Sequence, residues 1–192
     1  MKKFLVTGFQ PFGGETVNPS VEAVKLLPDE IMGVEIVKIE LPVVYYEALR
    51  VLEKAIDDLQ PVGILSAGQA DSRPNMTVER TAVNVAEANI PDNNGTTLTN
   101  QRVYENAPDG YFSTLPIKAM IAAINDAGIP ASISNTAGTF VCNDVLYSLL
   151  HHFACTGTRC GFIHVPWLPE QGEPNLSLEN TAKALEIAIS AL

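Results

Sequence analysis

Strand-like and helix-like segments alternate over the first third of the chain, and this alternation limits the folds that the chain can adopt. Three short apolar runs have strand character, and two longer segments between them show helical spacing, the first behind an Asn18 cap. In chain order, these segments are residues 3–7, 19–27, 34–41, 44–59 and 62–67. The pattern is typical of an α/β fold with a largely parallel sheet, whose functional sites lie beyond the carboxyl ends of the strands.

The remaining two thirds continue this pattern with one interruption. Residues 76–86 alternate like a strand, whereas residues 87–114 hold several Pro, Asn and Gly turns and no sustained period. We predict a long irregular loop there, of the kind that forms lids or interfaces. Helices are expected at 116–128 and, behind a Ser177 cap, at 178–192, and apolar strands at 131–134 and 161–166.

Length and charge narrow the class of protein. The 192 residues are not divided by a flexible linker or a charge block, which predicts a single domain spanning residues 1–192. The 12 basic and 22 acidic residues give a formal net charge of −10, which leaves no basic face for nucleic acid or anionic lipid. We therefore expect neither a nucleic-acid nor a membrane partner.

The amino-terminal run and the cysteines bear on location. Thr7 and Gly8 interrupt the first apolar run well short of a signal-peptide core or a membrane span. Cys142, Cys155 and Cys160 cannot all pair with one another, and their spacing matches no zinc motif. These features predict a cytoplasmic protein without a structural metal.

Cys142 is the first candidate for chemistry. It follows the predicted strand 131–134 and a turn containing Gly138, and it begins an apolar pattern with helical spacing. Free N–H groups and the positive end of the dipole at a helix N-terminus favour an anion, and they can lower the pKa of a thiol. Taken alone, the position also suits a small buried core residue.

Glu79 and His164 are the other unusual residues. Glu79 lies in a weakly charged strand-like run, and His164 interrupts an apolar strand just before a proline. A nucleophilic thiol needs a base, and the base needs a third group that fixes its tautomer. One Cys, one His and one Glu at one edge of a sheet would meet that need, although each residue alone also has a structural interpretation.

The loop after the first strand is rich in glycine and carries Phe9 and Phe12. It lacks the Gly-Lys-Ser/Thr and Gly-x-Gly-x-x-Gly patterns of phosphate-binding loops. Two aromatic residues at the end of a strand could instead form the wall of an apolar pocket or pack beneath the loop as core.

Seven blocks of the sequence resemble the pyroglutamyl-peptidase I family, also called pyrrolidone-carboxylate peptidases, which are cysteine exopeptidases that remove N-terminal pyroglutamate. The blocks keep the family's order over nearly the whole chain. They are Thr-Gly-Phe-Gln-Pro-Phe-Gly-Gly-Glu-Thr-Val-Asn-Pro-Ser (7–20), Gly-Gln-Ala (68–70), Val-Glu-Arg-Thr-Ala-Val-Asn (78–84), Ile-Pro-Asp-Asn (90–93), Tyr-Phe-Ser-Thr-Leu-Pro-Ile-Lys-Ala (111–119), Ser-Asn-Thr-Ala-Gly-Thr-Phe-Val-Cys-Asn (134–143) and Phe-Ile-His-Val-Pro (162–166).

The resemblance implies a three-layer α/β/α sandwich of the phosphorylase/hydrolase-like type with a twisted, largely parallel mixed sheet. It implies Cys142 as nucleophile, His164 as general base and then acid, and Glu79 as the residue that orients the imidazole, with no metal or organic cofactor. It also implies a cytoplasmic homotetramer that acts on peptides or proteins with N-terminal pyroglutamate. The substrate-binding residues that it implies are Phe9, Phe12 and Val141 around the lactam ring and Asn18 and Gln69 at the polar edge of that ring.

Four positions depart from the family's pattern. Asp71 and Ser72 replace two glycines, Asp144 replaces a histidine, and Asn89 replaces an arginine of the possible oxyanion region. Loss of one oxyanion donor can cost on the order of a hundredfold in rate. The departures leave two alternatives open, a divergent cysteine amidase that acts on another cyclic amide and a non-catalytic protein that binds a small ligand.

Overall fold

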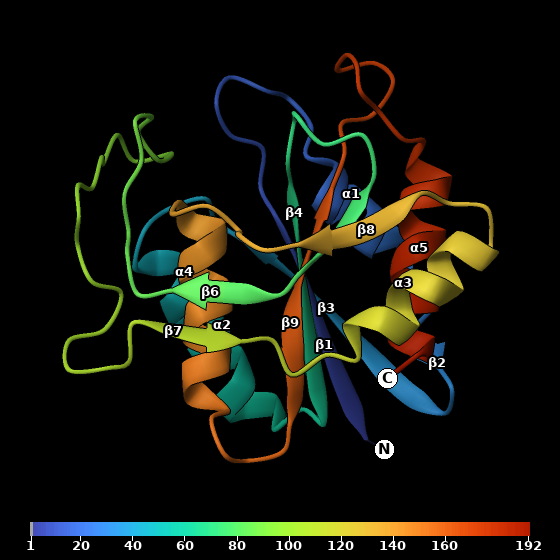
Figure 1. Cartoon of the computed structure of the whole chain (residues 1–192), viewed down its shortest axis with the longest axis horizontal. Coiled ribbons are helices and arrows are strands. Elements are labelled where there is room, and N and C mark those ends of the chain that lie inside the picture. Colours follow the sequence, from blue (N-terminus) through green and yellow to red (C-terminus); the bar gives the residue numbers. More distant parts are fainter. Residues whose placement is uncertain (1) are drawn as a thin grey trace.

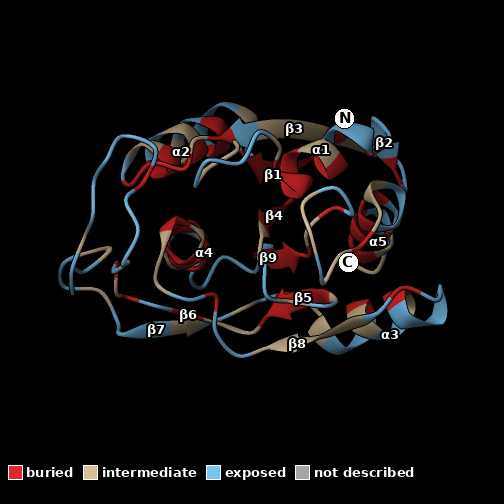
Figure 2. Cartoon of the chain, turned by 90° about the horizontal axis from the view of Figure 1, so that it is seen from above, coloured by how far each residue is buried: buried red, intermediate tan, exposed pale blue. Residues whose placement is uncertain are grey.

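The structure is a computed structural model that describes residues 2–192. Within these residues, a seven-stranded sheet has the order β2-β3-β1-β4-β9-β5-β8 and forms the middle layer of a sandwich, with helices on both faces (Figures 1 and 2). The helices α2 and α4 cover one face, and α1, α3 and α5 cover the other. The predicted three-layer α/β/α fold is therefore confirmed.

The elements follow the predicted alternation closely. The strands are β1 (Lys3–Phe9), β2 (Glu30–Ile31), β3 (Val34–Leu41), β4 (Gly63–Gln69), β5 (Met76–Glu79), β6 (Thr81–Val83), β7 (Gly110–Phe112), β8 (Ala131–Ser134) and β9 (Arg159–Val165). The helices are α1 (Pro19–Leu26), α2 (Glu47–Leu59), α3 (Ile117–Asp126), α4 (Val141–His152) and α5 (Leu178–Ser190). Both predicted side-chain caps are present, because Asn18 accepts a hydrogen bond from the Ser20 N–H and Ser177 accepts one from the Asn180 N–H.

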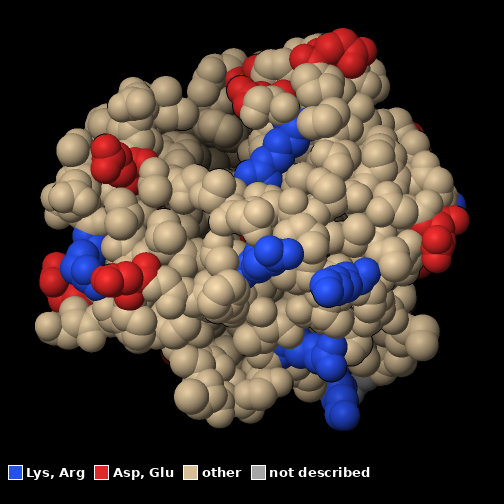
Figure 3. All heavy atoms as spheres, in the orientation of Figure 1, with Lys and Arg blue, Asp and Glu red and all other residues tan. Residues whose placement is uncertain are grey.

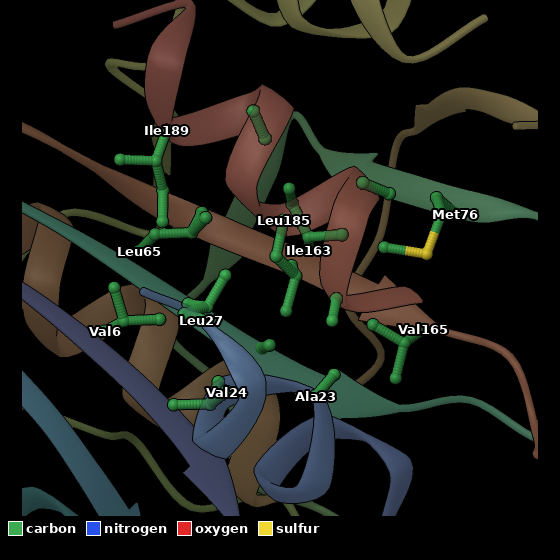
Figure 4. Packing of buried hydrophobic residues seen from close by; sticks show 14 of the residues in the cluster. Val6, Ala23, Val24, Leu27, Leu65, Met76, Ile163, Val165, Leu185 and Ile189 are labelled. Atoms are coloured by element: carbon green, nitrogen blue, oxygen red, sulfur yellow. The ribbon is translucent and has the colours of Figure 1, made fainter. Parts of the chain in front are cut away.

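Each face of the sheet has its own hydrophobic core. Strands β1, β4 and β9 are buried on both faces, which explains their nearly continuous apolar sequence. Toward α1 and α5, side chains such as Val6, Leu65 and Ile163 interlock with Val24 and Leu185 (Figure 4). Burying each of these side chains contributes about 1.5–3 kcal/mol to stability.

Three expectations about secondary structure were wrong in detail. The helix predicted from residue 44 begins only at Glu47, because Tyr46 has a φ of 62° in the left-handed region. The strand predicted over 76–86 is broken at Arg80, whose N–H bonds to Ser134 while its carbonyl accepts from Ser113. The chain leaves the main sheet at that point, and the predicted loop 87–114 contains β7, which pairs with β6.

Strand direction matters most for the site. Strands β1, β3, β4 and β9 run parallel, whereas β5 runs antiparallel to β9 and parallel to β8. Strand β9, which lies late in the sequence, occupies an interior position of the sheet between β4 and β5. Thr77 of β5 is paired with His164 of β9, and Gly68 of β4 is paired with the same histidine from the other side.

Candidate functional site

His164 and Glu79 meet in the sheet, where both side chains are almost completely buried. Nδ1 of His164 lies 2.7 Å from Oε1 of Glu79. Because β5 runs antiparallel to β9, with Thr77 opposite His164 and Val78 opposite Ile163, Glu79 at the end of β5 lies past His164 on the side of the amino end of β9. The carboxylate accepts a hydrogen bond from Nδ1–H and leaves Nε2 of the neutral imidazole as the free acceptor.

Cys142 lies in the first turn of α4, and its Sγ is close to Gly68, the residue of β4 that is paired with His164. A Cβ atom built on Gly68 would lie 2.9 Å from Sγ of Cys142 and 2.7 Å from the ring of Phe162. Those distances are shorter than normal contacts, so any side chain at position 68 would push the thiol away. Glycine at this position therefore makes room for the thiol over β4.

Burial sets the resting charge state of the thiol and the imidazole. Burial first, and the Glu79 carboxylate second, raise the pKa of the Cys142 thiol to about 12, although Arg73 acts in the opposite direction. Burial also lowers the pKa of His164, against the effect of the Glu79 hydrogen bond. The expectation that the helix N-terminus lowers the thiol pKa was therefore wrong, because desolvation outweighs the helix dipole. Burial thus disfavours both charged forms, the thiolate of Cys142 and the imidazolium of His164.

Arg73 is a member of this cluster that the sequence analysis did not single out. Its guanidinium lies 2.5 Å from Oε1 of Glu79 and also bonds to Thr77 Oγ1 and to the Thr136 carbonyl oxygen. Arg73 and His164 thus share one carboxylate oxygen, and the other, Oε2, is buried without a hydrogen-bond partner among the described residues.

The aromatic residues near the thiol differ in depth. Phe9 is buried and packs against Phe162, which in turn lies 4.8 Å from the His164 ring, centroid to centroid. Phe12 is only partly buried and packs against Phe140 at the start of α4. Phe9 therefore supports the site from below, whereas Phe12 and Phe140 lie nearer to the surface. The sequence analysis named Val141 as a candidate residue but not its neighbour Phe140. In the structure Val141 is buried, and Phe140 is the residue that contacts Phe12.

Two residues expected at the polar edge of a ligand have different surroundings. Asn18 is buried, and its Oδ1 accepts hydrogen bonds from the backbone and hydroxyl of Ser20 while its Nδ2 donates to the Gln10 carbonyl. Only one of its amide hydrogens is left for another partner. Gln69, at the end of β4, is partly exposed, and its Oε1 accepts from Gln171. Gln69 is therefore freer than Asn18 to bind a ligand.

The long segment after β6 is braced by two asparagine side chains. Asn143, next to Cys142, is fully buried, accepts from the Val83 N–H and donates to the Val83 and Val85 carbonyls. Asn84 accepts from the Val103 and Tyr104 N–H groups. Each such bond contributes about 1 kcal/mol. The brace fixes the start of α4 relative to the segment that carries Asn89.

The positions that depart from the resembled family lie in different environments. Asp71 and Ser72 are exposed in a turn after β4, and Asn89 is exposed as well. Asp144 is the exception, because it is buried in the first turn of α4 and its Oδ1 has no hydrogen-bond partner among residues 2–192. Burial raises the pKa of Asp144 to about 8.

We expect Asp144→Asn to stabilise the protein more at pH 9 than at pH 4.5. Between the ordinary pKa of 3.8 and the folded pKa of about 8, the unfolded chain loses this proton while the folded chain keeps it, so stability falls as pH rises through that window. Asparagine removes this loss, which is on the order of a few kcal/mol. Urea unfolding at both pH values measures the gain, and Asp126→Asn, at an exposed position, is the control. Equal gains at the two pH values would contradict the buried, protonated carboxyl.

The last features of the described residues concern surface charge, metal ligands and membrane-spanning helices. Charged side chains are scattered over the face shown in Figure 3, and the surface is hollowed near its upper end. Among residues 2–192, no group of three or more His, Cys, Asp or Glu side chains is arranged to hold a metal ion. In the same part of the chain, no helix is both long enough and apolar enough to cross a membrane.

Comparisons with known proteins agree with one another. A sequence model of the family described as pyroglutamyl peptidase matches residues 2–192. The pyrrolidone-carboxylate peptidase of Thermococcus onnurineus (strain NA1) is 49% identical over 193 residues, covering 97% of this chain and 96% of the relative. That of Yersinia pestis (strain Pestoides F) is 50% identical over 198 residues, covering 99% and 92%.

Solved structures give the same result. The crystal structure of Bacillus amyloliquefaciens pyroglutamyl peptidase I superposes with a TM-score of 0.95 at 45% identity, covering 100% of this chain and 96% of that one. A mutant pyrrolidone carboxyl peptidase from the hyperthermophile Pyrococcus furiosus superposes with a TM-score of 0.95 at 41% identity, covering 98% and 97%.

Proposed function

The chain belongs to the pyroglutamyl peptidase family, and we propose that Cys142, His164 and Glu79 carry out its removal of N-terminal pyroglutamate. The observation that carries the proposal is the 2.7 Å contact between Nδ1 of His164 and Oε1 of Glu79. His164 is paired with Gly68 of the neighbouring strand, and the Cys142 thiol lies over Gly68. A nucleophile, a base and an orienting carboxylate in this order match the general logic of triads.

Proton transfer accompanies the first step. Since the resting thiol is neutral, Sγ of Cys142 attacks the carbonyl carbon after the lactam ring while its proton passes to Nε2 of His164. A bond forms between Sγ and the carbonyl carbon, and the carbonyl electron pair moves to oxygen. Glu79 stabilises the imidazolium that results.

The tetrahedral intermediate then collapses. The electron pair on oxygen restores the carbonyl, the C–N bond breaks, and the imidazolium gives its proton to the departing amine. A water molecule deprotonated by the same imidazole attacks the thioester and releases pyroglutamate and the thiol. The step consumes one water and needs no oxidant or reductant.

The start of α4 supplies groups for the oxyanion. Phe140, its N-cap residue, makes no side-chain capping bond, so N–H groups of the first turn remain available to an anion. Asn89, in the braced segment, is a neutral donor at the position where the resembled family carries arginine. Backbone donors therefore carry more of the oxyanion stabilisation in this chain.

The proposed specificity depends on two groups of side chains, one apolar and one polar. Phe12 and Phe140 are partly exposed and pack together, while Val141 and Phe9 are buried, and these apolar side chains suit a flat uncharged ring. Gln69 and the one free amide hydrogen of Asn18 donate hydrogen bonds to the substrate. These donors are left without a partner when the lactam carbonyl is absent.

The same proposal covers the setting of the enzyme. A single domain is expected from the undivided sequence, and a homotetramer and a cytoplasmic location are expected from the family resemblance. The three free cysteines and exposed apolar side chains such as Met32 and Phe112 are consistent with a reducing compartment and with contacts between subunits.

Release of the fluorophore from pyroglutamyl-aminomethylcoumarin tests the function. We expect turnover of this substrate and none of the prolyl analogue, which has the same ring size but lacks the lactam carbonyl and carries a charged amine. The protein should be shown to be folded by circular dichroism in the same buffer. Equal cleavage of both compounds, or no cleavage by the folded protein, would contradict the proposal.

A further inference from the structure

Gln171 lies in the loop after β9, and both ends of its carboxamide are engaged. Its Oε1 accepts from the Leu168 N–H at 3.0 Å. Its Nε2 lies 3.4 Å from the Val17 carbonyl oxygen, 3.3 Å from Oε2 of Glu15 and 3.2 Å from Oε1 of Gln69. The loop therefore connects the start of α1 with the end of β4, at the upper end of the sheet in Figure 1.

These partners determine which end of the Gln171 amide faces which way. A backbone N–H can only donate and a backbone carbonyl can only accept. Leu168 therefore requires an oxygen on one side of the amide, and Val17 requires the NH₂ group on the other.

The orientation of Gln171 in turn sets that of Gln69. Because Gln171 presents N–H donors, the atom of Gln69 that faces it must be the acceptor Oε1. Among residues 2–192, no hydrogen bond engages Nε2 of Gln69. Its two N–H groups are therefore the ones available to a ligand.

We infer that Gln171 is a positioning residue that fixes the polarity with which Gln69 meets the substrate. Gln69 donates to a carbonyl oxygen; since the acyl oxygen of a pyroglutamyl group faces the start of α4 in the proposed mechanism, the acceptor is the lactam oxygen. The inference rests on the proposed function and adds to it the residue that makes Gln69 a donor. A substrate without that oxygen leaves the Gln69 donors unpaired.

Gln171→Glu tests the inference because it replaces the NH₂ donor of residue 171 with an acceptor oxygen. A carboxylate there faces the Glu15 carboxylate, the Val17 carbonyl and Oε1 of Gln69, and rotation of the Gln69 amide relieves the last of these repulsions. Gln69 then presents oxygen to the lactam oxygen. We expect KM for pyroglutamyl-aminomethylcoumarin to rise roughly 10- to 100-fold, with kcat changed little.

Gln171→Met is the matched variant, because it keeps the side-chain length and removes the restraint without forcing the amide to rotate. Its KM should rise only about 3- to 5-fold, less than that of Gln171→Glu. The inhibition constant of 2-pyrrolidone, which is the bare lactam, should rise in parallel with KM. If Gln171 only stabilised the fold, its replacement would lower kcat and thermal stability and would not raise KM selectively.

The outcomes separate the two proposals. Failure of the wild-type protein to cleave the substrate would overturn the proposed function. Normal wild-type cleavage, with KM and the 2-pyrrolidone constant unchanged in a folded Gln171→Glu variant, would overturn only the role of Gln171. If Gln171→Glu does not fold, Gln171→Met decides, and an unchanged KM in that variant overturns the inference.

Discussion

Replacement of Cys142 by alanine is expected to lower kcat by at least about 10⁴-fold, because the thiol is the only atom proposed to bond to the substrate carbonyl. The substitution shortens a side chain above Gly68 and adds no atom there. We therefore expect the folded structure and the substrate affinity to be retained, so that the loss falls on kcat. Steady-state rates on pyroglutamyl-aminomethylcoumarin measure it.

Cys155→Ser is the matched control, since Cys155 is exposed and lies outside the site. It should retain wild-type turnover. Acid quench followed by mass spectrometry gives an independent reading, in which a pyroglutamyl adduct appears on the peptide containing Cys142 in the wild type and is missing in Cys142→Ala. An adduct on another residue, or substantial turnover by the alanine variant, would reassign the nucleophile.

Glu79→Gln is expected to lower kcat roughly 100-fold, which is less than the roughly 10⁴-fold loss that follows when a triad histidine takes the wrong tautomer. Arg73 and His164 both bond to Oε1 of Glu79. Arg73 holds the amide oxygen of glutamine at the same place, so that it still accepts Nδ1–H. The tautomer survives, and what is lost is the negative charge that stabilises the imidazolium.

The pH dependence of this variant provides a second reading. The Glu79 carboxylate raises the pKa of His164, and burial lowers it. Removing the charge therefore lowers that pKa further, so the acid limb of kcat/KM moves to lower pH. Glu105→Gln, at an exposed position, should leave both rate and profile unchanged. An unchanged kcat and an unshifted acid limb in Glu79→Gln would remove Glu79 from the mechanism.

The layers of the fold could be predicted because they depend on local patterns. Continuous apolar runs mark β1, β4 and β9, and the Asn18 and Ser177 caps mark helix starts, all of which short-range chemistry determines. The direction of β5 could not be predicted in the same way. Its residues read equally well in a parallel or an antiparallel strand, and the path of the connecting chain decides between them.

The candidate site, too, could be predicted only in part from the sequence. Cys142, His164 and Glu79 stand out as residue types that do not suit their apolar surroundings, so sequence alone could identify them as candidates. Their charge states could not be predicted, because desolvation of Cys142 depends on what packs above it from distant parts of the chain. Arg73 and Gln171 act through contacts with residues that the fold alone brings near, and no local pattern marks them.

The interior place of β9 has a consequence for when the site can form during synthesis. This strand, residues 159–165, joins the half of the sheet built from β1 to β4 to the half built from β5 and β8. Until it has left the ribosome and inserted between them, His164 is absent and Glu79 has no imidazole to orient. Pairing between such distant segments forms late in folding. The His164–Glu79 pair can therefore form only after almost the whole chain has been synthesised.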